Sequence, residues 1–174
     1  LSLSFFYKFL LLGILTSLLF PPFFITPLGF IIFPYFFYLI TSKKFIFLSY
    51  KMHFLSGFFF GIGFFSIFLS WLKDPFLLND LTVNFALFSY LLVIYCAIYV
   101  GFVVCLLKFL KNNILKLIAF PSLIVASEFA CSNFLYGFPW FSFSLVHSAN
   151  NFGTTLIYYL GTYGLSYITI VLFL

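Results

Sequence analysis

The sequence predicts an all-α protein, a polytopic transmembrane helical bundle of about six spans with its N-terminus in the cytoplasm. Of its 174 residues, 65% are hydrophobic and only 6% are charged, and the mean hydropathy is +1.25. A soluble domain carries roughly 25% charged residues. This composition therefore excludes a cytosolic enzyme and a disordered chain, and it indicates an integral membrane protein.

Charged residues divide the apolar sequence into stretches of membrane-spanning length, about 20 helical residues for a 30 Å hydrocarbon core. The predicted spans are 8–20, 23–41, 53–72, 81–107, 114–132 and 154–174. The first two are short and form a tight hairpin, because Pro21 and Pro22 disfavour a continuous helix at their junction. The segment 137–153 is rich in Gly, Pro, Ser and Asn, which predicts a loop or a re-entrant stretch.

The lysines orient these spans. Lys8 precedes the first span, and the other lysines on its side are Lys43, Lys44, Lys51, Lys108, Lys111 and Lys116. Lys73 falls on the opposite side, together with Asp74 and Asp80. Since cytoplasmic loops are enriched in Lys and Arg, we expect the lysine-rich side to be cytoplasmic and the loops at 73–80 and 137–153 to face outward.

The two ends of the sequence predict a fragment of a larger polypeptide. The chain begins with Leu1 rather than Met, and it stops at Leu174 within an apolar stretch. A natural final span normally ends in an interfacial or basic anchor.

Glu128 is an ionisable residue inside a predicted span, which is costly and makes it a candidate for function by default. The alternative is a Glu that only packs helices. The residues one turn later are Cys131 and Ser132, so a cationic partner would have to be Lys73 or His147 on the outward side. We expect Glu128 to anchor the outward segment.

The motif Gly137-Phe138-Pro139-Trp140 follows Glu128 on the outward side. Gly and Pro indicate an unusual backbone, and Trp favours the membrane interface, so an aromatic anchor on a turn is the simpler interpretation.

Glycines have a packing role in this prediction. Gly57, Gly61 and Gly63 in the third span lie on faces where small residues let membrane helices approach closely. We expect the same of Gly161 and Gly164 in the last span.

Other chemistry is not indicated. The residues form no catalytic triad, no metal-binding cluster, no cofactor motif and no nucleotide loop. Cys96, Cys105 and Cys131 lie in apolar stretches without C-x-x-C spacing, which is typical of small core residues.

The stretch from Glu128 to Ser166 resembles the membrane domain of apolipoprotein N-acyltransferase. The matching motifs are Glu128-Phe129, Gly137-Phe138-Pro139-Trp140 and Gly161-Thr162-Tyr163-Gly164-Leu165-Ser166. Upstream, the glycine-rich third span ending at Trp71 is similar to that of the family. This chain departs from the family pattern at three positions. Cys131 stands where the family has Arg, Asn133 where it has an aromatic residue, and Leu145 where it has Tyr.

The resemblance implies a bacterial inner-membrane enzyme of lipoprotein maturation. Family members transfer an acyl chain from a phospholipid, through a Cys thiol, to the N-terminal amine of diacylglyceryl-cysteine in an apolipoprotein. Their Glu-Lys-Cys triad lies in a nitrilase-like domain that these residues do not include, so we expect the chain alone to be inactive. The resemblance makes Glu128, Gly137–Trp140 and Trp71 candidates for placing the lipid substrates. It implies no cofactor, metal or nucleic acid.

The alternative is a small structural membrane subunit of a respiratory or transport complex, in which Phe-rich sequences also occur. A transporter is less favoured, because one Glu within the spans is little provision for an ion path.

Overall fold

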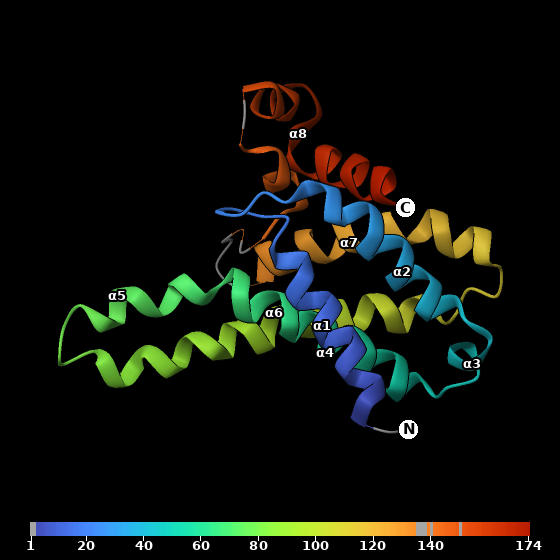
Figure 1. Ribbon diagram of the computed structural model, residues 1–174, viewed down its shortest axis with the longest axis horizontal. Helices are drawn as coiled ribbons and strands as arrows, with labels where there is room; N and C mark the ends of the chain where they lie inside the picture. The colour runs from blue at the N-terminus through green and yellow to red at the C-terminus, as the bar shows by residue number, and fades with distance from the viewer. Residues whose placement is uncertain (1–2, 135–138, 140, 150) are drawn as a thin grey trace.

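The computed structural model describes residues 3–134, 139, 141–149 and 151–174, and their regular elements are all helical, as Figure 1 shows. This confirms the predicted all-α membrane bundle. The helices are α1 (Leu3–Ser17), α2 (Gly29–Thr41), α3 (Lys43–Ile46), α4 (Tyr50–Phe68), α5 (Asp74–Leu77), α6 (Ser89–Leu107), α7 (Asn113–Phe134) and α8 (Asn151–Phe173). Short 3₁₀ helices are η1 (Thr26–Leu28), η2 (Ser70–Lys73), η3 (Val83–Phe88) and η4 (Phe143–His147).

Four described segments are long and apolar enough to cross a membrane: Tyr50–Phe68, Val83–Leu107, Asn113–Phe134 and Asn151–Phe173. The first two helices are shorter, with 15 residues in α1 and 13 in α2. At 1.5 Å per residue, both fall well short of a hydrocarbon core of about 30 Å. The chain turns between them at 18–25, around the Pro21-Pro22 pair that predicted a break.

Helix α4 lies between α1 and α6 and meets both through glycines. A methyl group at Gly61 would lie 2.7 Å from Cα of Ala97 in α6, and one at Gly57 would lie 2.5 Å from the carbonyl oxygen of Val100. On the other side, a methyl group at Gly63 would collide with the backbone carbonyl of Leu10 in α1. The predicted packing role of these glycines is confirmed, since any side chain would force the helices apart. We call Gly57, Gly61 and Gly63 the glycine interface.

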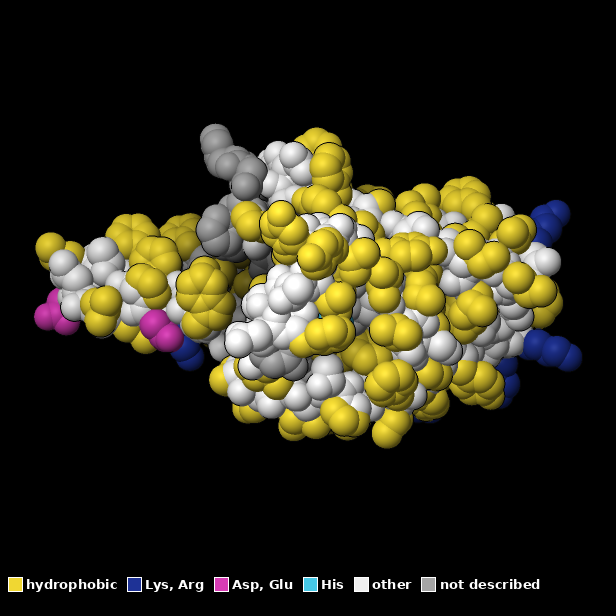
Figure 2. All heavy atoms as spheres, turned by 90° about the horizontal axis from the view of Figure 1, so that it is seen from above, with side chains coloured by type: hydrophobic (Ala, Val, Ile, Leu, Met, Phe, Trp, Pro, Cys, Tyr) yellow, Lys and Arg dark blue, Asp and Glu magenta, His cyan; other side chains and the backbone are white. Residues whose placement is uncertain are grey.

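The two ends of the bundle differ in charge. Figure 2 shows several lysine side chains at one end of the bundle, and acidic side chains together with a further lysine on a projecting arm at the other. The arm consists of η2, α5 and η3, and its apolar side chains are largely exposed, including Leu78 and Leu81. Charge is therefore separated along the long axis, as the predicted orientation requires.

Helix α8 is interrupted at Gly161, where the sequence predicts an unbroken span. Gly161 has φ 67° and ψ 169°, a conformation that an L side chain rarely adopts. Two helical pieces meet there at an angle (Figure 1). The expectation that Gly161 and Gly164 pack against a neighbouring helix is wrong. Among the described residues, no contact within 4 Å is found for a methyl group built on Gly161, and one on Gly164 would meet only Cβ of Leu160 in α8 itself.

Candidate functional site

Glu128 lies in the last part of α7 with its side chain fully buried. Its Oε1 accepts a hydrogen bond from the backbone N–H of Phe143 at 2.9 Å, and its Oε2 accepts one from the Ser142 hydroxyl at 3.3 Å. Both donors belong to the segment that follows α7. Glu128 therefore holds the entry to η4 against α7, as expected of an anchor for this segment.

Three serines extend this contact to α8. Oγ of Ser142 lies 2.9 Å from Oγ of Ser166 and 2.8 Å from Oγ of Ser144. The backbone N–H of Ser144 donates to Oγ of Ser166 at 3.0 Å. All three serines are buried. Since the Ser142 hydroxyl donates to Glu128, its oxygen is the acceptor in its other contacts, which include the backbone N–H of Ser144 at 3.3 Å. We call Glu128, Ser142, Ser144 and Ser166 the polar seam.

Aromatic side chains seat the same segment on the bundle. The ring centroid of Phe141 lies 4.8 Å from that of Phe65 in α4, in an edge-to-face arrangement. The ring of Phe143 lies 5.3 Å from that of Phe20 in the first turn. Phe141 and Phe143 are both buried. Phe141 and Phe143 therefore lie in the apolar core, while Ser142 and Ser144, which alternate with them, belong to the polar seam.

A small pocket of about 110 Å³ opens beside the polar seam. Glu128, Ser132, Pro139, Phe141, Ser142, Thr162 and Tyr163 line it. The hydroxyls of Ser132 and Tyr163 are 2.9 Å apart, which connects α7 to the second half of α8. A pocket of this volume has room for only a few atoms, so it can accommodate a side chain or water molecules but not a lipid acyl chain.

His147 closes the far end of η4. Its Nε2 lies 2.8 Å from Oγ1 of Thr169, and that hydroxyl donates to the carbonyl of Leu165. The Thr169 oxygen therefore accepts from His147, which places the imidazole proton on Nε2. Burial lowers the pKa of His147 below its usual value of 6.5, so the imidazole is neutral at pH 7.

The predicted site residues are only partly brought together. Gly137, Phe138 and Trp140 lie outside the described residues, whereas Pro139 is exposed and lines the small pocket. Trp71 lies in η2 at the base of the arm and is about half exposed.

The expected cationic partner of Glu128 is not found. His147 bonds to Thr169 instead, and no ion pair to Glu128 occurs within the described part of the chain. The buried carboxyl group is satisfied by a hydroxyl and a backbone N–H in place of a charge.

Sequence reasoning missed the serines and Thr169. A signal was available in the alternation of Phe141-Ser142-Phe143-Ser144, which places polar groups between core aromatics. The matching positions Ser166 and Thr169 are three residues apart, on one face of a helix.

Among the described residues, the side chains do not form a metal-binding site or a reactive thiol site. No cluster of three or more His, Cys, Asp or Glu occurs in that part of the chain. Cys96 of α6 and Cys131 of α7 are buried, with their sulfur atoms 3.5 Å apart, so they contribute to helix packing as expected.

Comparison with known proteins identifies a family. The model of the apolipoprotein N-acyltransferase N-terminal domain matches residues 12–173. No curated protein is significantly similar to the sequence. Because the family match covers nearly all of the 174 residues, the chain belongs to the apolipoprotein N-acyltransferase family, as an N-terminal domain.

Proposed function

We propose that these residues are the membrane platform of an enzyme that transfers an acyl chain from a phospholipid to the N-terminal amine of diacylglyceryl-cysteine in lipoproteins. The family match supports this assignment. The observation that supports it is the segment 141–147, which Glu128 of α7 and Ser166 of α8 hold through buried hydrogen bonds. A structural subunit would not require so many buried polar contacts to fix one short segment.

The proposal places the protein in the bacterial inner membrane. The lysine-rich end faces the cytoplasm, and the arm and the 139–149 segment face outward. On that side, Glu128 is a positioning residue. It fixes a surface beside the outer leaflet where the phospholipid and apolipoprotein substrates meet the catalytic residues of the enzyme. Pro139 and Trp71 are on the same outward side, and with Gly137, Phe138 and Trp140 they are proposed to contact substrate or the catalytic part.

The platform by itself is proposed to be inactive. Acyl transfer through a thiol requires a thiolate and a nearby base. Cys96 and Cys131 are buried against each other, and Cys105 lies partly buried on α6. None of these thiols is placed as a nucleophile for a lipid ester.

The test is N-acylation of a lipoprotein in a bacterial strain depleted of its own enzyme. The whole reading frame that encodes these residues is expressed in that strain, and the mass of the N-terminal lipopeptide of a lipoprotein is measured by mass spectrometry. We expect a gain of one acyl chain with the whole product and none with residues 1–174 alone. An inserted whole product that leaves the lipopeptide unchanged, and that migrates with a respiratory or transport complex, would contradict the proposal.

A further inference from the structure

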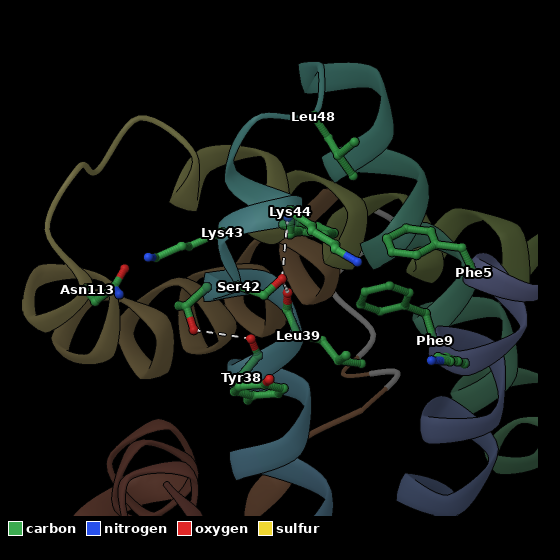
Figure 3. Close-up of a pocket in the computed structure, with 12 residues that line it drawn as sticks. Phe5, Phe9, Tyr38, Leu39, Ser42, Lys43, Lys44, Leu48 and Asn113 are labelled. Carbon is green, nitrogen blue, oxygen red and sulfur yellow. Dashed lines mark hydrogen bonds between the residues drawn. The ribbon is translucent and has the colours of Figure 1, made fainter. Parts of the chain in front are cut away.

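A second, larger cavity lies at the lysine-rich end, remote from the polar seam. Its volume is about 790 Å³, it is open on one side, and it is lined by residues of α1, the end of α2, α3 and the start of α7. Figure 3 shows the lining side chains, with Lys43 and Lys44 extending from α3 in different directions around the opening. This volume is comparable with that of a small-molecule binding site, and much larger than the pocket beside Glu128.

The walls of the cavity are largely apolar. Phe9 and Phe45 are fully buried, and their ring centroids are 5.9 Å apart. Phe5 stacks on Phe45 at 6.1 Å, while Leu39 and Leu48 complete the wall. Such a surface favours hydrocarbon over an ion in water.

The rim of the cavity is cationic. Lys8 of α1 and Lys43 and Lys44 of α3 line it, and all three are exposed. The lining also includes the hydroxyls of Thr41 and Ser42, which are already used as donors to the carbonyls of α2. The lysines are therefore the charged groups of this rim that are available to an anion, and the side-chain amide of Asn113 also lies in the lining.

Nothing acidic in the chain neutralises this rim. The sequence has three acidic side chains. Asp74 and Asp80 lie on or beside the arm at the opposite end, and Glu128 is bonded to Ser142 and Phe143. A cationic rim above an apolar wall complements one kind of molecule in a bilayer, a lipid with an anionic head group and hydrocarbon chains.

We propose that this cavity binds an anionic phospholipid of the lysine-side leaflet. The phosphate lies among Lys8, Lys43 and Lys44. The upper part of an acyl chain lies against the partly exposed side chains of Phe5, Leu39 and Leu48. The site is separate from the outward surface proposed for acyl transfer, and it does not depend on that activity. Its occupant would contact α1, the end of α2, α3 and the start of α7 together.

The test uses native mass spectrometry of the intact protein in detergent, with phosphatidylglycerol and phosphatidylcholine added separately and glycerol phosphate added as a competitor. We expect phosphatidylglycerol to bind at least about tenfold more tightly than phosphatidylcholine, because each lysine near an anionic lipid adds to the attraction. Glycerol phosphate should not displace it. Equal affinity for the two lipids, or displacement by glycerol phosphate, would overturn the proposal.

Two triple variants separate the site from general charge attraction. The variant Lys8→Gln, Lys43→Gln, Lys44→Gln should lose the preference for phosphatidylglycerol. A control with Gln at the exposed lysines 51, 73 and 111, which do not line the cavity, removes the same charge and should keep it. Equal losses in both variants would overturn the assignment.

A measurement on the unmodified protein does not depend on how the variants fold. Phosphatidylglycerol that carries a photoreactive group near the ester end of one acyl chain is crosslinked to the protein in vesicles, and the labelled peptides are identified. We expect crosslinks within residues 5–9 and 38–48. Crosslinks confined to other segments would overturn the proposal.

Discussion

The glycine interface and the polar seam hold the bundle together by opposite means. At the glycine interface, side chains are absent, and the backbones of α1, α4 and α6 approach until a methyl group would collide. At the polar seam, buried oxygens and N–H groups hold a short segment between α7 and α8. Contacts of the first kind lack direction, whereas hydrogen bonds fix orientation. The difference indicates that the first region builds the frame and the second places a functional surface on it.

The largest effect should come from filling the glycine interface. Gly63→Leu places a side chain against the backbone of Leu10, which cannot move without displacing α1. We expect a loss of about 3 kcal/mol or more in stability, and failure of much of the protein to fold. Thermal melting in detergent measures it. Gly164→Ala is the control, since its methyl group would meet only Cβ of Leu160 at 3.5 Å. Equal melting of wild type and Gly63→Leu would show that α1 and α4 are not packed as described.

The next largest effect should come from Glu128→Ala, which removes the acceptor of two hydrogen bonds. The Phe143 N–H then lies buried without its partner, a cost of roughly 1–3 kcal/mol. Hydrogen exchange should accelerate in residues 141–147 and stay unchanged in α4. Asp80→Ala, at an exposed acidic residue, is the matched control. Faster exchange throughout the bundle would place Glu128 in the frame, contrary to this account.

Two fully buried serines make the comparison sharper. Ser166→Ala removes bonds to Oγ of Ser142 and to the N–H of Ser144, and should cost about 1 kcal/mol. Ser56→Ala in α4 removes only a bond to the carbonyl of Met52 in its own helix, and should be nearly neutral. Melting of both variants decides the point, and a greater loss at Ser56 would reverse the assignment of the two regions.

The smallest effect should be a pH dependence at His147. Burial lowers the pKa of the folded imidazole, so the unfolded chain binds more protons just below pH 6.5. The contribution of His147 to stability is therefore complete above about pH 6.5 and decreases as the pH falls. Exchange in residues 141–148, corrected for its intrinsic pH dependence, should rise between pH 7 and pH 5.5. His147→Gln should remove this rise, and a rise that persists in the variant would assign it to another group.

The sequence predicted the frame better than the polar seam, for a physical reason. Burial of apolar helices and close approach at Gly57, Gly61 and Gly63 follow from composition and helical spacing, which are local properties. The partners of Glu128 come from positions 14 and 15 residues away, in a different segment from α7. Such partners depend on the tertiary fold, so the sequence suggested Lys73 or His147 where the fold supplies Ser142 and Phe143.

The break in α8 was missed for the same kind of reason. Gly161 has the same local pattern as the packing glycines, and only its backbone conformation separates it from them. The short helices α1 and α2 were anticipated, because the 34 uncharged residues between Lys8 and Lys43, divided by the prolines, are too few for two full spans.

The most direct test of the central claim, that Glu128 positions the outward surface for acyl transfer, is the rate of lipoprotein N-acylation by the whole gene product carrying Glu128→Gln. The account predicts a fall of about tenfold or more in kcat/KM, equivalent to about 1.4 kcal/mol, with melting of the frame unchanged. Asp80→Asn, which makes the same chemical change at an exposed position, should transfer at the wild-type rate. A Glu128→Gln enzyme as active as wild type would contradict the claim and leave Glu128 as a packing residue.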